Sequence, residues 1–234
     1  MHAAPPVTPL TLPLDADDLI LYGGTFDPPT RAHIDLPALA RDAVLPGAVL
    51  VYIPAARSPH KPGGPDAPDD ARVEMLKAAI DARTRTLIWT DEIDRAKASG
   101  EPSYMVDTLR RARQSLGGKP RMRLLIGADQ ALAFHRWKDH AEIAQLAEPL
   151  VMLRTPSESA EALLDQLAET GAWSDAELER WRARIAPVPT MGVSATDARE
   201  ILKSRGTDSG ALEALLPAPV LDIIRRRGLY GINS

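Results

Sequence analysis

Residues 19–33 read Leu-Ile-Leu-Tyr-Gly-Gly-Thr-Phe-Asp-Pro-Pro-Thr-Arg-Ala-His. The first four residues form an apolar run that is typical of a buried strand. The two glycines that follow permit positive φ and a close approach of the backbone to a phosphate group. A helix that begins near Thr30 would aim its free N–H groups at an anion. The stretch therefore predicts a strand, an anion-binding turn and a helix in succession.

Other short apolar runs alternate with helical patterns along the chain. The strands that we expect cover residues 19–22, 49–53, 86–90, 123–127 and 150–153. Helical patterns lie at 70–82 and at 103–116, where Ser103 is a candidate cap. Apolar strands that alternate with helices predict an α/β fold, with a Rossmann-like parallel sheet of about five or six strands and helices on both faces. Ligands of such sheets bind at the carboxyl ends of the strands.

The two ends of the chain differ from this pattern. Residues 1–18 contain four prolines and end in an acidic cluster, which predicts a flexible N-terminal arm before a domain of residues 19–234. From about residue 157 onward we expect a helical C-terminal region. Its helices are predicted at residues 160–169, 174–184, 196–204, 210–215 and 220–227.

Composition limits the classes of function. The net charge is −4, which argues against nucleic acid as the main partner. The chain has no cysteine, so a disulfide framework, a thiolate zinc site and a cysteine nucleophile are excluded. No apolar run approaches the length of a membrane span, and the N-terminus does not resemble a secretory signal. We therefore expect a cytoplasmic protein with no membrane partner and no protein-bound metal.

Three groups of polar residues are candidates for binding phosphate. Thr30 and His33 lie three residues apart, so a helix would place both donors on one face. Lys61 lies in a proline-rich loop after the second strand, where its ammonium group can be held in place. A third group, Ser194, Thr196 and Arg199, lies at the start of a predicted helix. Each group also has a structural interpretation, as helix caps or solvated surface residues.

Two further segments follow the predicted strands. Asp129 comes after the fourth strand beside a glycine, a position at which a carboxylate commonly accepts hydrogen bonds from ribose. Trp137 follows eight residues later. Its neighbours Arg136 and Lys138 would point away from it if this segment were helical. We interpret the other tryptophans, Trp89, Trp173 and Trp181, as packing residues.

Together these segments resemble the bacterial nicotinate-nucleotide adenylyltransferases of the nucleotidyltransferase superfamily. The match starts with GGTFDPPTRAH at 23–33 and SPHKP at 58–62, and it continues with SYMVDT at 103–108. It ends with FHRW at 134–137, GVSATDAR at 192–199 and GLY at 228–230. The chain departs from the family pattern at Thr30 (usually histidine), Ala32 (usually glycine) and Met105 (usually threonine).

The resemblance implies that the chain transfers AMP from ATP to nicotinate mononucleotide and releases pyrophosphate. It implies catalytic roles for the donors and cations Thr30, His33, Lys61 and Arg199. ATP would bind at Gly23, Gly24, Thr25, Phe26, Asp129, Ser194 and Thr196. Nicotinate mononucleotide would bind at Ser103, Tyr104 and Asp107, with its pyridine ring stacked on Trp137. Mg²⁺ would enter with ATP, bridging its phosphates, and a homo-oligomer is compatible with the family.

Two alternatives stay open at this point. One is another adenylyltransferase of the superfamily, such as an enzyme that acts on phosphopantetheine, although such chains are usually shorter and lack the SPHK, SYMVDT and FHRW segments. The other is a nucleotide-binding regulator that has lost catalysis. Incubation with ATP and nicotinate mononucleotide, followed by a test for pyrophosphate, separates all three.

Overall fold

The protein is described by a computed structural model that covers residues 5–56, 64–100, 102–118, 120–154, 157 and 159–232. Five parallel strands form one sheet in the order β3-β2-β1-β4-β5. The strands are β1 (Asp18–Gly24), β2 (Val49–Pro54), β3 (Thr86–Ile88), β4 (Arg121–Gly127) and β5 (Glu148–Met152). This confirms the predicted parallel sheet of about five or six strands.

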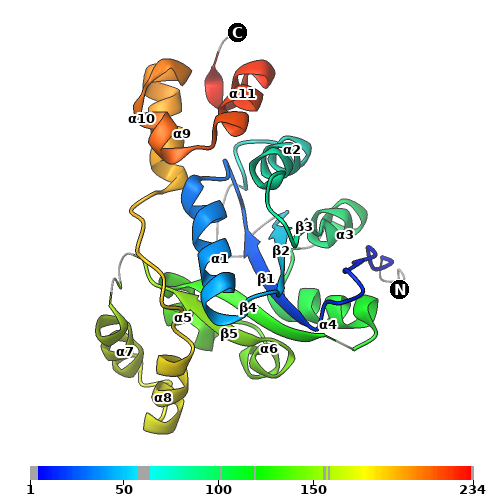
Figure 1. The fold of residues 1–234 in the computed structure, drawn as a ribbon, viewed down its shortest axis with the longest axis vertical. Coiled ribbons are helices and arrows are strands. Elements are labelled where there is room, and N and C mark those ends of the chain that lie inside the picture. Colours follow the sequence, from blue (N-terminus) through cyan, green and yellow to red (C-terminus); the bar gives the residue numbers. More distant parts are fainter. Residues whose placement is uncertain are drawn as a thin grey trace.

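Helices cover both faces of the sheet (Figure 1). They are α1 (Arg31–Val44), α2 (Asp69–Ile80), α3 (Asp91–Ser99), α4 (Met105–Leu116), α5 (Ala128–Ala133), α6 (His140–Leu146), α7 (Ala160–Glu169), α8 (Asp175–Ala183), α9 (Ala195–Arg205), α10 (Ala211–Leu215) and α11 (Ala218–Arg227). Short 3₁₀ turns cover Phe134–Arg136, Gly206–Asp208 and Leu229–Gly231.

Alternate residues of β1 belong to two different hydrophobic clusters. Leu19 and Leu21 pack in a cluster with residues of α4, α6, α7 and α8. Ile20 and Tyr22 pack in a second cluster with residues of α1 and α2. Since successive side chains of a strand point to opposite faces, the central strand is buried on both sides. A third cluster lies among α9, α10 and α11 and includes Met75 of α2.

Residues 5–17, which the sequence predicts as part of a loose arm, pack along α3 and α4. The side chain of Leu10 is buried in the first hydrophobic cluster, and its N–H donates to the hydroxyl of Ser115 at 2.8 Å. The Trp89 indole N–H donates to the carbonyl of Thr8 at 2.9 Å. The guanidinium of Arg111 donates to the Pro5 and Pro6 carbonyls. Proline prevents regular structure here but still permits an extended chain whose polar groups are satisfied by helix side chains.

The sheet places the candidate site at the carboxyl ends of its central strands. The chain runs from β1 to β2 and β3 on one side of β1, and from β4 to β5 on the other. The strand order therefore changes direction between β1 and β4, where ligands of such sheets bind at the carboxyl ends. Figure 1 shows α9, α10 and α11 gathered near the C-terminus, beyond the end of β1 at which α1 begins.

Candidate active site

Gly23 and Gly24, at the carboxyl end of β1, leave room for two neighbouring side chains. A Cβ atom on Gly24 would lie 2.8 Å from the ring of Phe26, and one on Gly23 would lie 3.0 Å from the Met105 methyl group. Phe26 has a φ of 49°, which turns the chain sharply after the strand. Its buried ring packs edge-on against His33 at 5.5 Å. The glycines thus shape the turn and bring the start of α4 beside it.

The turn continues into α1 through a reciprocal cap between Thr30 and His33. The Thr30 hydroxyl accepts from the His33 N–H at 3.4 Å, and the Thr30 N–H donates to His33 Nδ1 at 3.1 Å. Because Nδ1 accepts a backbone N–H, the neutral ring carries its proton on Nε2. Thr30 is fully buried, whereas His33 is only partly buried. The two residues lie together as predicted, and the geometry also makes Thr30 a residue that orients His33.

A buried arginine supports the same turn. Arg72 of α2 is fully buried, and its guanidinium donates to the Thr25 carbonyl at 2.5 Å and to the Asp69 carboxylate at 2.6 Å. Thr25 itself is partly exposed. Sequence reasoning missed Arg72, because an arginine four residues into a polar helix start carries no pattern of its own. A buried cation that holds a carbonyl of the turn fixes the path of the backbone there.

The C-terminal motif reaches the same turn. Arg199 of α9 donates to the Asp27 carbonyl at 2.6 Å and to the Thr196 hydroxyl at 3.3 Å, so Thr196 and Arg199 point the same way as predicted. Ser194 caps α9 by accepting from the N–H groups of Thr196 and Asp197. The GGTFDPPTRAH and GVSATDAR motifs therefore meet at one place.

At the end of β4, Asp129 forms an ion pair with Arg154, whose Nε donates to Asp129 Oδ1 at 2.8 Å. The pair lies over Gly127, where a Cβ atom would come within 2.5 Å of Arg154 Nε. Both side chains are well exposed. Sequence reasoning missed Arg154, although a lone cation shortly after a buried strand is a signal for a ligand at the sheet edge.

Ser103, Tyr104 and Asp107 lie at the start of α4. The helix begins at Met105, and Ser103 does not cap it, which corrects the predicted boundary. Ser103 is buried, and its hydroxyl has no hydrogen-bond partner within the described part of the chain. Lys138 lies 4.8 Å from the centre of the Tyr104 ring and 3.4 Å from the Asp107 carboxylate. These contacts bring the segment after β4 to the start of α4.

Trp137 is partly buried, and its ring lies 5.3 Å from that of Phe134. Its backbone is extended, with φ −72° and ψ 142°, because the preceding 3₁₀ turn ends at Arg136. The segment is therefore not helical at this point, and Lys138 points toward Tyr104 and Asp107. The packing interpretation of the other tryptophans is confirmed: Trp89 and Trp181 are buried, and Trp173 packs partly buried against the first cluster.

Comparison with known proteins identifies the family. The model of the cytidylyltransferase-like family matches residues 21–201. A probable nicotinate-nucleotide adenylyltransferase from Stenotrophomonas maltophilia is 35% identical over 220 residues, which cover 90% of this chain and 96% of that protein. One from Chromobacterium violaceum is 32% identical, covering 90% and 97%. The chain belongs to the nicotinate-nucleotide adenylyltransferase family.

Solved structures of this family share the fold. The nicotinic acid mononucleotide adenylyltransferase of Plasmodium falciparum, in complex with NaAD, is similar with a TM-score of 0.67 and 16% identity. The similar region covers 93% of this chain and 98% of that one. The complex of the same enzyme with APC gives a TM-score of 0.65. At this identity the similarity extends to the fold.

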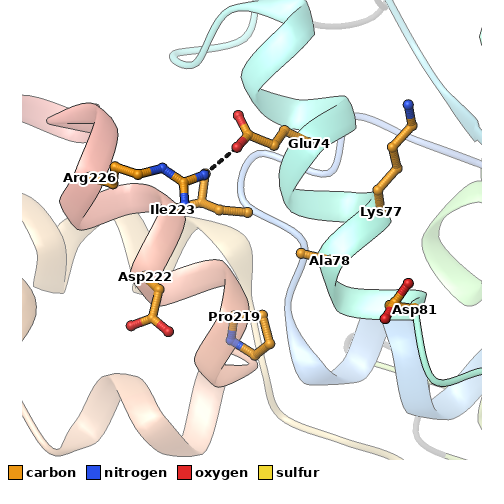
Figure 2. A pocket seen from close by; sticks show the side chains of 8 residues that line it. All are labelled: Glu74, Lys77, Ala78, Asp81, Pro219, Asp222, Ile223 and Arg226. Atoms are coloured by element: carbon orange, nitrogen blue, oxygen red, sulfur yellow. Dashed lines mark hydrogen bonds and ion pairs between the residues drawn. The ribbon is translucent and has the colours of Figure 1, made fainter.

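Lys61, with the rest of its SPHKP segment, lies outside the described residues. A surface groove between α2 and α11 contains no residue of the predicted site (Figure 2). It is lined by Glu74, Lys77, Ala78, Asp81, Pro219, Asp222, Ile223 and Arg226, and Arg226 pairs with Glu74 across it.

The part of the chain that the structure describes has neither a metal-binding cluster nor a membrane-spanning helix. No group of three or more histidine and acidic side chains in residues 5–56, 64–100, 102–118, 120–154, 157 and 159–232 could hold a metal ion. Over the same ranges, no helix is both long and apolar enough to cross a membrane.

Proposed function

We propose that this protein transfers AMP from ATP to nicotinate mononucleotide, giving nicotinate adenine dinucleotide and pyrophosphate in NAD biosynthesis. The observation that carries the proposal is the meeting of segments far apart in the chain at the carboxyl end of β1. Arg199 contacts Asp27 of the first motif, and Met105 lies against Gly23. The relatives of more than 30% identity over nearly their whole length support the same reaction.

The reaction needs no protein nucleophile. A 5′-phosphate oxygen of nicotinate mononucleotide is already anionic, and it attacks the α-phosphorus of ATP in line with the leaving pyrophosphate. One P–O bond forms, and the bond from the α-phosphorus to the bridging oxygen breaks. The protein contributes orientation and stabilisation of the charge on the transferred group. Mg²⁺ enters bound to the ATP phosphates, as is usual for a strongly hydrated ion.

Each predicted residue has a role in this scheme. The Nε2–H group of His33, whose ring is oriented by Thr30, donates to the transferred phosphoryl group. Arg199 and Lys61 neutralise phosphate charge, and Ser194 and Thr196 contribute donors at the start of α9. Gly23, Gly24, Thr25 and Phe26 form the turn that faces ATP, and Asp129 accepts from its ribose. Ser103, Tyr104, Asp107 and Trp137 bind nicotinate mononucleotide.

A direct assay tests the proposal. The purified protein is incubated with MgATP and nicotinate mononucleotide, and pyrophosphate and the dinucleotide are measured. Parallel reactions contain nicotinamide mononucleotide or phosphopantetheine. Pyrophosphate release only with phosphopantetheine would favour the alternative adenylyltransferase, and nucleotide binding without release would favour a regulator. Sedimentation of the same sample tests whether the protein forms a homo-oligomer. We expect the enzyme to act in the cytoplasm.

Thr30 offers a separate prediction. Thr30→Val keeps the shape of the buried side chain but removes the hydroxyl that caps α1 and contacts His33. We expect the free energy of unfolding to fall by about 1 kcal/mol, the usual value of a cap. Turnover should fall as well, because His33 loses a contact that orients it. Thr30→Ser, which keeps the hydroxyl, should retain both. Steady-state kinetics and thermal unfolding measure the effect, and full turnover in Thr30→Val would leave the residue with a structural role only.

A further inference from the structure

Asp27, in the turn between β1 and α1, is a buried carboxylate with three donors around it. The N–H of Asp66 donates to Oδ2 at 2.7 Å, and the N–H of Ala67 donates to Oδ1 at 3.1 Å. The hydroxyl of Tyr230 donates to Oδ1 at 2.7 Å. The residue is only 4% exposed, so these bonds replace the hydration of the charge. None of the roles assigned above uses this carboxylate.

The donors come from segments that are distant in the sequence. Asp66 and Ala67 precede α2, and Tyr230 follows α11 near the end of the chain. The ring of Tyr230 packs in the third hydrophobic cluster with Ala198 and Leu202 of α9. Asp27 also accepts from Arg199 through its carbonyl. The turn is thus tied to α9 in two ways, directly through Arg199 and indirectly through Tyr230.

The backbone of Tyr230 indicates that this placement is specific. It has φ 61° and ψ 30°, in the left-handed region that bulky residues rarely adopt. Gly228 and Gly231 on either side also have positive φ, so the chain bends back on itself here. Such a backbone persists only where surrounding contacts hold it, and strained residues of this kind cluster at functional sites. The contacts here are the third cluster and the bond to Asp27.

We infer that Asp27 and Tyr230 form a positioning pair that sets the start of α9 relative to the turn after β1. The inference rests on the proposed function, since Ser194, Thr196 and Arg199 at that start are assigned to the ATP phosphates. The pair touches no reacting atom. Its effect passes through α9, and it therefore acts on the binding of ATP rather than on that of nicotinate mononucleotide.

The test compares Tyr230→Phe with Ile223→Val. The first variant removes only the hydroxyl, whereas the second trims one methyl group from the same cluster without reaching Asp27. We expect Tyr230→Phe to raise the KM for ATP about tenfold, the scale of one hydrogen bond to a charged group. The KM for nicotinate mononucleotide should stay close to that of wild type. Ile223→Val should lower thermal stability and leave both KM values unchanged.

A second comparison adds Asp27→Asn and the double variant. Since the two residues share one hydrogen bond, Tyr230→Phe should add little to the KM for ATP once Asp27 has been replaced. Additive effects, or a KM for ATP in Tyr230→Phe equal to that of Ile223→Val, would overturn the inference and leave Tyr230 as a packing residue.

Hydrogen exchange gives a readout that needs no activity. In Tyr230→Phe, amides in the first turn of α9 should exchange faster than in wild type, while Ile223→Val should affect mainly α11. If wild type makes no dinucleotide, the proposed function fails and this comparison alone decides whether the pair holds α9. Equal exchange rates of the α9 amides in the two variants would also overturn the inference that Asp27 and Tyr230 position α9.

Discussion

Replacing His33 by alanine is expected to lower kcat by on the order of 10² or more, the usual loss of one preorganised donor. The structure supplies the reason for this size. The Thr30 N–H donates to Nδ1 and the Phe26 ring packs edge-on against the imidazole, so the ring is held before substrate arrives. A donor that needs no reorganisation stabilises the developing charge on the phosphoryl group most strongly. Binding of ATP should change far less than kcat, because several other donors share its phosphates.

His33→Asn separates this role from the capping of α1. The asparagine oxygen can accept from the Thr30 N–H, as Nδ1 does, but its amide group is shorter than the imidazole. We expect this variant to recover the stability lost in His33→Ala and to remain slow. Turnover and thermal unfolding are measured for both variants. Near wild-type turnover in His33→Ala would remove the residue from the mechanism, and recovery of turnover in His33→Asn would reduce it to a cap.

The strands and most helices could be predicted because their apolar residues recur with a clear period. Residues 19–22, for example, form a continuous apolar run that the sheet buries on both faces. Helix α3 was missed because its nine residues, Asp91–Ser99, include one large apolar side chain, Ile93, so no helical period can be detected. The packing of residues 5–17 was missed for a related reason. The apolar residues Val7, Leu10 and Leu12 are interrupted by prolines and threonines and form no continuous run. Ser115 of α4, which accepts from the Leu10 N–H, is 105 residues away in the chain.

Some contacts of the candidate site could likewise be predicted from the sequence, and others could not. Thr30 with His33, and Thr196 with Arg199, could be paired from the sequence because helical spacing determines which side chains are neighbours. The contacts of Asp27 could not, because one of its partners, Tyr230, is 203 residues away and depends on how α11 ends. Neither could the ion pair of Arg154 with Asp129, which depends on β4 and β5 being neighbours in the sheet. Contacts within an element follow from local geometry, whereas contacts between elements follow from topology.

Trp137→Ala is expected to lower kcat/KM for nicotinate mononucleotide and for nicotinamide mononucleotide by a similar factor. The loss should correspond to about 1–3 kcal/mol of binding free energy, the scale of an aromatic stack. The two pyridine rings have nearly the same shape, so stacking cannot distinguish a carboxylate from a carboxamide. One side of the indole packs against Phe134, which keeps the ring in place. The preference for nicotinate should therefore persist in the variant. Trp137→Phe, which keeps an aromatic face, should lose less for both substrates.

Lys138 tests where that preference comes from. It is one of the two cations next to Trp137 in the sequence, but its ammonium group lies over the Tyr104 ring and near the Asp107 carboxylate, which offsets its charge. We therefore expect backbone N–H groups around Trp137 to recognise the carboxylate, because they donate hydrogen bonds to it and cannot accept one from an amide NH₂. On this basis Lys138→Met should leave the ratio of kcat/KM values for the two mononucleotides unchanged. A lower ratio in Lys138→Met would show that the lysine recognises the carboxylate. A collapse of the ratio in Trp137→Ala, with kcat/KM for nicotinamide mononucleotide unchanged, would show that the tryptophan sets the preference.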